Sequence, residues 1–227
     1  MSRRLAFRTA VTAITAAAVA VLAGCGSGKT AASGSASTPG FSTMSDAKNT
    51  QHAVMAVPST PRITAEGRTT APPWDAPADP SARVAAAGLG MMGAEGNVMH
   101  IHAHLDVLVN GKPVTVPAFI GIDEKAKQIS PVHTHDPSGI IHIESPAKAT
   151  FTLGQFMTEW NVALDADRIG GLKAGGGNLL RAYVNGKQIK GDPAAIMLHA
   201  HEEIALVYGP ANEKGKVPAT FPFRAGM

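Results

Sequence analysis

The histidines of this chain are concentrated in one region and follow the spacing of extended strands. The chain contains nine histidines. Side chains at positions i and i+2 of a strand point to the same face, with their Cα atoms roughly 6.5–7 Å apart. Two imidazoles in a His-x-His pair can therefore converge on one ion, and a neighbouring strand can supply a third. Eight of the histidines lie between residues 100 and 201, namely His100, His102, His104, His133, His135, His142, His199 and His201.

The chemistry that this pattern predicts is the binding of a transition metal. Imidazole is a common ligand of zinc and copper, and the single cysteine, Cys25, cannot form a structural zinc site of the finger type. We expect zinc or copper, bound by neutral imidazoles with an unperturbed pKa of about 6.5, so that affinity falls from about pH 7 to about pH 5. The expected ligands are, first, His102, His104, His133, His135 and His142, and then His100, His199 and His201.

Two other functions fit the same residues. A His-x-His pair with a third histidine resembles the zinc site of carbonic anhydrases, and such an enzyme would need an open coordination position and a base such as Glu144 or Glu202. Neutral histidines could instead form a hydrogen-bond network in a structural module of the cell envelope. Three His-x-His segments favour metal binding, so we expect binding rather than catalysis and assign no catalytic residue. Glu144 is then expected as a ligand, or as the partner that fixes the tautomer of an imidazole.

A first hairpin is expected to carry three of the histidines. Apolar and polar residues alternate from about residue 98 to residue 109, which is typical of a strand with one face toward the core. Asn110-Gly111 is the strongest short signal for a tight hairpin turn. The returning strand should place Val114 opposite Val107.

A second hairpin is expected to oppose histidines directly. In the stretch "HTHDPSGIIHIE", the residues Asp136–Gly139 have the composition of a type I turn. This turn would pair His133 with His142 and His135 with Ile140. The Cβ atoms of a directly opposed pair lie about 4.5–5.5 Å apart, so the imidazoles of the first pair should lie within reach of one ion.

The remaining elements are expected to complete a small sheet with one helix. Thr152 and Gln155 have the spacing of a capping box, and a single apolar stripe predicts a helix over about 153–163. A second Asn-Gly turn at Asn185-Gly186 predicts a third hairpin, and a last strand is expected over about 203–208.

These elements predict an α+β fold, a small and mainly antiparallel β domain with one helix. The order resembles the β-grasp arrangement, in which the first and last strands are parallel neighbours. That arrangement would bring residues 100–104 and 199–201 to the same end of the sheet. We expect the domain to span residues 96–209 and residues 210–227 to form an extended C-terminal tail.

The N-terminal region has the features of an export signal. Three arginines precede an apolar run over residues 10–22, and the tetrapeptide Leu22-Ala23-Gly24-Cys25 follows. This arrangement resembles the lipobox of bacterial lipoproteins. The resemblance implies that residues 1–24 are a signal peptide and that lipid on Cys25 anchors the chain at the extracytoplasmic face of the cell membrane. Residues 25–95 are rich in Ala, Ser, Thr, Pro and Gly, which predicts a disordered tether.

Charge and motifs argue against nucleic acid and nucleotide as partners. The sequence pI is about 9.1. Without the three arginines of the signal segment, however, the chain carries 17 basic and 17 acidic residues. The "GSGKT" stretch at Gly26–Thr30 lacks the earlier glycine of a phosphate-binding loop, and no strand pattern precedes it. The sequence identifies no protein partner.

The domain as a whole also resembles a known group of proteins. The stretches "HIHAHLDVLVNG", "HTHDPSGIIHIESP", "FTLGQFMTEWNV" and "HEEIALVYG" are similar to a histidine-rich domain, uncharacterised in function, of exported prokaryotic proteins. The resemblance covers residues 98–209. It implies export and the limits of the domain, and it implies no activity.

Overall fold

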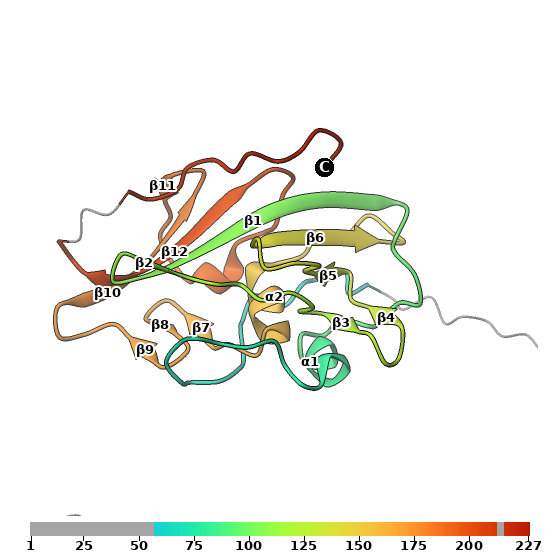
Figure 1. Ribbon diagram of the computed structural model, residues 1–227, viewed down its shortest axis with the longest axis horizontal. Helices are drawn as coiled ribbons and strands as arrows, with labels where there is room; N and C mark the ends of the chain where they lie inside the picture. The colour runs from blue at the N-terminus through green and yellow to red at the C-terminus, as the bar shows by residue number, and fades with distance from the viewer. Residues whose placement is uncertain (1–56, 213–215) are drawn as a thin grey trace, which may run out of the picture. The chain divides into compact units, whose positions relative to one another are not determined.

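The computed structural model describes residues 57–212 and 216–227 (Figure 1). The predicted signal segment, Cys25 and the first part of the predicted tether lie outside the described residues. The described part has the expected α+β fold, with a mainly antiparallel sheet. In this part of the chain no helix has the length and apolar character needed to cross a membrane.

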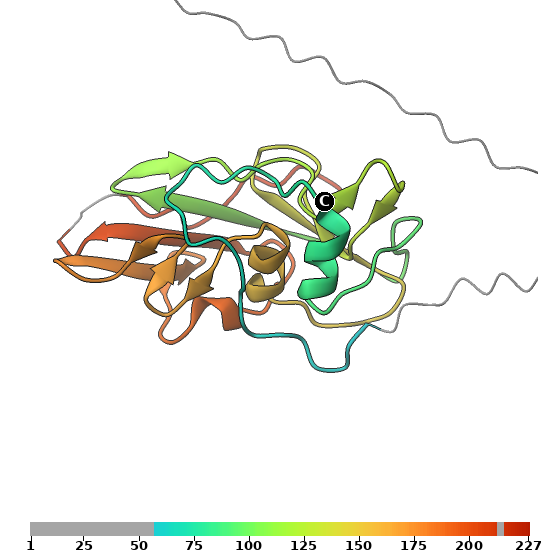
Figure 2. The same ribbon diagram turned by 90° about the horizontal axis from the view of Figure 1, so that it is seen from below.

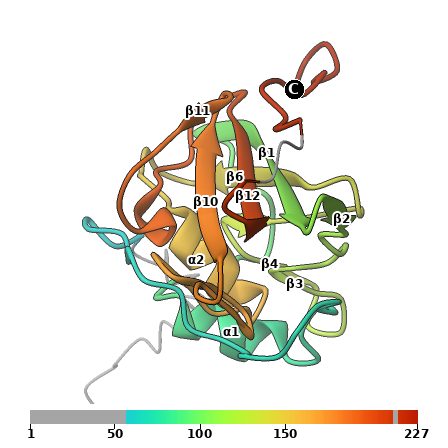
Figure 3. The ribbon, with the colours of Figure 1, turned by 90° about the vertical axis from the view of Figure 1, so that its left-hand side faces the viewer.

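One large mixed sheet forms the centre of the domain, in the order β11-β10-β12-β1-β6-β5, with β2 also paired to β1. Strands β1 and β12 are parallel neighbours, as the β-grasp arrangement predicts, and Figure 3 shows them beside β10. Strands β6 and β5 extend the sheet on the other side of β1. The strands of this sheet are β1 (Met99–Val109), β2 (Lys112–Val114), β5 (Val132–His133), β6 (Ile140–Ser145), β10 (Asn178–Val184), β11 (Lys187–Gln188) and β12 (Glu203–Pro210).

The two edges of the long central strand β1 pair with different strands. One edge pairs with β12 from His104 to Val109. The other edge pairs with β6 over residues 99–104 and then with β2 over residues 107–109. Val107 lies opposite Val114, as predicted, because the positive φ angles of 51° at Asn110 and 73° at Gly111 close the tight turn.

The predicted helix is present as α2 (Leu153–Glu159) and begins with the expected capping box. It ends four residues earlier than expected, because Trp160 caps it and Asn161 then takes a positive φ angle of 62°. Two further helices are α1 (Pro80–Ala86) and the 3₁₀ helix η1 (Pro193–Ala195), so the prediction of one helix was incomplete. Small sheets are formed by β3 (Ile122–Asp123) with β4 (Gln128–Ile129), and by β7 (Leu164–Asp165), β8 (Arg168–Ile169) and β9 (Leu172–Lys173).

The two faces of the large sheet differ in what covers them. Figures 1 and 3 show α1 and α2 on one side of the sheet and the C-terminal segment on the other. The apolar stripe of α2 is fully buried in the core, with 0% exposure at Leu153, Phe156, Met157 and Trp160. The apolar alternates of β1, such as Ala103 and Leu105, join this core. The histidines of β1 therefore lie on the face away from the helices.

The predicted start of the domain at residue 96 was wrong. Trp74 and Val84 are 2% and 0% exposed and belong to the core. Trp74 packs edge-to-face on Trp160 with ring centroids 5.7 Å apart, an arrangement that contributes about 0.5–1.5 kcal/mol beyond area burial. Figure 2 shows the segment passing along α2, where Glu66 N donates to Thr158 Oγ1 over 3.0 Å. A segment that packs on the core through isolated side chains leaves no periodic pattern in the sequence. The composition of residues 57–95 therefore led to the wrong prediction of a disordered tether.

Candidate metal centre

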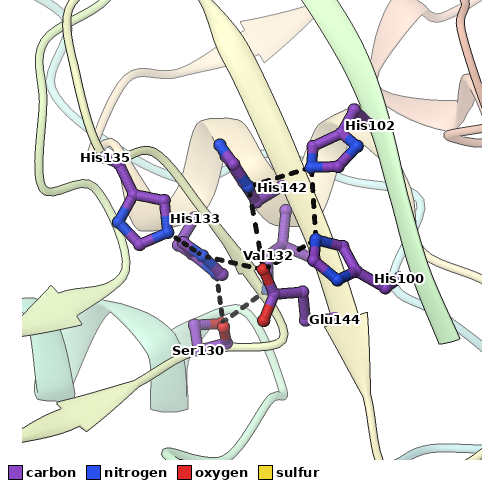
Figure 4. A network of polar contacts seen from close by, with 8 residues as sticks. All are labelled: His100, His102, Ser130, Val132, His133, His135, His142 and Glu144. Atoms are coloured by element: carbon purple, nitrogen blue, oxygen red, sulfur yellow. Dashed lines mark hydrogen bonds and ion pairs between the residues drawn. The ribbon is translucent and has the colours of Figure 1, made fainter. Parts of the chain in front are cut away.

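Three neighbouring strands bring five histidines and one glutamate together on the face away from the helices (Figure 4). The register places His102 opposite His142 and His100 opposite Glu144. On the other edge of β6, His133 lies opposite His142, as the turn residues predicted. The cluster consists of His100 and His102 on β1, His133 on β5, His135 just after it, and His142 and Glu144 on β6.

The donor atoms of the cluster are spaced like the ligands of one ion. His100 Nε2 lies 3.2 Å from His102 Nε2, and His133 Nε2 lies 3.1 Å from His135 Nε2. His102 Nε2 also lies 3.1 Å from Nδ1 of His142. Two nitrogens bound tetrahedrally to zinc at 2.0–2.1 Å are themselves about 3.3 Å apart. The strands thus hold the nitrogens close to the separations of a coordination shell.

Hydrogen bonding cannot account for all of these contacts. A ring nitrogen offers either one proton or one lone pair. His102 Nε2 nevertheless faces two nitrogens, those of His100 and His142, so at most one of these contacts can be a good hydrogen bond. The other nitrogen of His102, Nδ1, is buried with no hydrogen-bond partner among the described residues. A cation between the three nitrogens would use all of their lone pairs.

His133 is held in the tautomer that leaves a lone pair for a ligand. Its side chain is fully buried, and Nδ1 donates to the carbonyl oxygen of Ser130 over 2.9 Å. A neutral imidazole that donates from Nδ1 has a free lone pair on Nε2. This second nitrogen points into the cluster, toward His135. A backbone carbonyl in this role is typical of metal-binding histidines.

The carboxylate of Glu144 is buried among the histidines of the cluster. It is 1% exposed, and its Oε1 lies 3.2 Å from His100 Nε2, 3.8 Å from His133 Nε2 and 3.7 Å from His142 Nδ1. Its Oε2 is buried without a hydrogen-bond partner in the part of the chain that the structure describes. Burial raises the pKa of this carboxyl group. A bound cation would compensate the cost of burying the carboxylate.

The electrostatics of the cluster keep its buried imidazoles neutral. Burial, assisted by the neighbouring His135, lowers the pKa of His133 to about 3 and that of His142 to about 4. Burial also lowers the pKa of His102, with a further contribution from His100. Imidazole must be neutral to bind a metal. These side chains therefore stay competent as ligands at pH values where a free imidazole is protonated.

Two overlapping sets of residues in the cluster could hold a metal ion. Within each set, one ligand atom from every residue lies within 4.8 Å of the others. His142 belongs to both sets. The first set is His133, His135, His142 and Glu144, and the second is His100, His102 and His142.

His104 was expected among the main ligands of the cluster. The structure places it instead in a separate group of potential metal ligands, with Asp106 and Glu203. Its Nδ1 lies 2.7 Å from Glu203 Oε2, and its Nε2 donates to the carbonyl oxygen of Ser138 over 2.8 Å. Burial opposes protonation, but the hydrogen bond and charge of Glu203 outweigh it and raise the pKa of His104. Both nitrogens are engaged while this pair is intact, so neither offers a lone pair.

His199 and His201 were expected as further ligands, and the structure brings them near the cluster without including them. The backbone N–H of His201 donates to the carbonyl oxygen of His102 over 2.7 Å, so the two segments meet as the parallel arrangement predicted. The ring of His201 is exposed, and its Nε2 donates to the main-chain oxygen of Met227. Of the described metal-capable groups, none includes His199 or His201.

The C-terminal tail contributes an aromatic cover that the sequence did not predict. Phe221 stacks on His104 with ring centroids 3.8 Å apart and an interplanar angle of 14°. Phe223 lies 5.0 Å from the ring of His201 by the same measure. The expected extended tail therefore packs on the histidine-bearing face. A protonated His104 beneath an aromatic ring gains a favourable cation–π contact.

Replacing Glu203 with glutamine tests the assignment of His104 to an ion pair. We expect Glu203→Gln to lower the pKa of His104 and to reduce the free energy of unfolding by roughly 1.5–3 kcal/mol, since it removes a hydrogen bond to a charged group from a buried side chain. Nuclear magnetic resonance titration and urea denaturation measure the two effects. The half-buried neighbour Glu202 provides the control substitution Glu202→Gln. An unchanged pKa of His104 in Glu203→Gln would contradict the assignment.

Comparison with known proteins adds no constraint on function. No protein-family model matches the chain, and searches of curated proteins and of solved structures also found no match.

Proposed function

We propose that this chain is a membrane-anchored, extracytoplasmic protein that binds zinc or copper and serves in acquisition, buffering or delivery of that metal. The observation that carries the metal-binding part is the contact of His102 Nε2 with two other imidazole nitrogens at 3.1 and 3.2 Å. Protons can satisfy only one of these contacts, whereas a cation satisfies both. The buried, unpartnered Oε2 of Glu144 supports the same proposal.

Binding is favoured over catalysis by the surroundings of the cluster. Two ligands, His100 and His135, are exposed to solvent. An accessible set of ligands suits uptake and transfer of an ion.

The direct test is calorimetric titration of the purified, metal-free protein with Zn²⁺, Cu²⁺ and Mg²⁺. We expect zinc or copper to bind more tightly than micromolar and Mg²⁺ to bind weakly, because imidazole suits the first two ions and Mg²⁺ prefers oxygen ligands. Equal, weak binding of all three ions would contradict the proposal.

The proposed location rests on the lipobox-like tetrapeptide that ends at Cys25. We expect Cys25→Ser to release the protein from the membrane fraction or to leave its signal segment uncleaved. Fractionation with immunoblotting distinguishes these forms. A mature Cys25→Ser protein that remains in the membrane fraction would show that lipid on this cysteine is not the anchor.

A further inference from the structure

The cluster holds more ligands than a single zinc or copper ion uses. Structural zinc sites are almost always four-coordinate, and catalytic zinc sites use three protein ligands. Here six side chains converge, and four of them form two pairs of histidines. Figure 4 shows His133 and His135 on one side, His100 and His102 on the other, and His142 between the two pairs.

The distances separate the two pairs and connect them through one carboxylate. The Nε2 atoms are 3.1 Å apart in the first pair and 3.2 Å apart in the second. The Oε1 atom of Glu144 reaches toward both pairs, at 3.8 Å from His133 Nε2 and 3.2 Å from His100 Nε2. Its second oxygen, Oε2, is buried without a hydrogen-bond partner among the described residues. One carboxylate oxygen in this position, Oε1, can bind both ions.

We propose that the site binds two metal ions, one through His133 and His135 and one through His100, His102 and His142, with the carboxylate of Glu144 bridging them. His142 is assigned to the second ion because its Nδ1 lies 3.1 Å from His102 Nε2. This inference rests on the proposed metal-binding function and extends it to stoichiometry and arrangement. Ions paired in this way are typically about 3.5–4 Å apart.

Each position combines a buried histidine with an exposed one. The first includes His133, which is 0% exposed, and the second includes His102, which is 5% exposed. Each position has an exposed histidine, His135 in the first and His100 in the second. Either histidine can therefore be replaced without opening the core, which allows each ion to be removed separately.

The test combines stoichiometry with the magnetic interaction between two bound ions. We expect the metal-free protein to bind two Zn²⁺ per chain, and His135→Ala and His100→Ala to bind one each. The control His199→Ala, an exposed histidine outside the cluster, should still bind two. With two Cu²⁺ bound, electron paramagnetic resonance should show a spin-coupled pair, and each single-site variant should show one isolated Cu²⁺. Circular dichroism confirms that the variants are folded.

The possible outcomes separate this inference from the proposed function. One tightly bound ion per wild-type chain at saturation would overturn the two-ion site and leave metal binding in place. Two ions without spin coupling would overturn the bridge, as would an unchanged coupled spectrum in Glu144→Gln. No bound zinc or copper at all would overturn both proposals.

Discussion

Replacing His142 with alanine is expected to lower the affinity for zinc at the position formed with His100 and His102 by more than about 100-fold, because loss of even an outer partner of a metal ligand costs 10–100-fold. His142 belongs to both sets of residues that could hold an ion. Its ring lies against those of His102, His133 and His135, with centroids 4.6, 5.3 and 4.5 Å away. Competition with a chelator of known affinity measures the loss.

The same substitution separates a metal site from a structural network of histidines. A network would lose hydrogen bonds in His142→Ala, and the metal-free variant would be less stable by about 1–3 kcal/mol. A metal site without its ion has crowded nitrogens that stabilise little, so we expect a change below about 1 kcal/mol. Urea denaturation in the presence of a chelator decides between them, with the exposed His199→Ala as the control. Unchanged zinc affinity in His142→Ala would contradict the assigned site.

Short-range patterns predicted most of the cluster correctly. The turn residues Asp136–Gly139 predicted the pairing of His133 with His142, and strand alternation predicted that Glu144 shares their face. The pairing of His135 with Ile140 does not occur in β5, which ends at His133. The ring of His135 reaches the cluster nevertheless, since its Nε2 contacts that of His133.

Features that depend on distant parts of the chain could not be predicted in this way. His104 has the same spacing as His102, but its partner Glu203 is 99 residues away and is placed by the register of the parallel strands. The carbonyl oxygen of Ser130 orients His133 and has no side-chain signal in the sequence. The cover formed by Phe221 depends on the path of the tail, which no periodicity reveals.

The metal-free protein is expected to lose stability as the pH falls from about 6.5 to about 5. The folded state keeps His133 and His142 neutral, with pKa values of about 3 and about 4. In the unfolded state both take up protons near pH 6.5. The unfolded state therefore binds more protons across this range, and the free energy of unfolding falls with pH. The linkage predicts a loss of about 2–4 kcal/mol over this range from the two groups together.

Other titratable groups also change the pH dependence of stability, and a variant of His142 isolates the contribution of that histidine. Burial opposes protonation of His104, but Glu203 outweighs it and raises the pKa of His104. The stability that His104 contributes is therefore complete below about pH 6.5 and does not change as the pH falls to about 5. Burial raises the pKa of Glu144, which acts in the opposite direction. We therefore compare wild type with His142→Gln in urea at pH 6.5 and pH 5, both with chelator. The variant should lose about 1–2 kcal/mol less than wild type, and an equal loss in both proteins would contradict the low pKa of His142.

The low pKa values also change the expected response of metal binding to acid. The sequence predicted that affinity falls between pH 7 and pH 5, as protons compete for imidazoles with an ordinary pKa. In the folded protein, His133 and His142 stay neutral through that range, so protons compete with the metal less than expected. Acid should then release the metal mainly by unfolding the domain. Zinc release and loss of circular dichroism are expected to follow the same pH curve, and zinc lost at a higher pH than the fold would show that ligand protonation acts first.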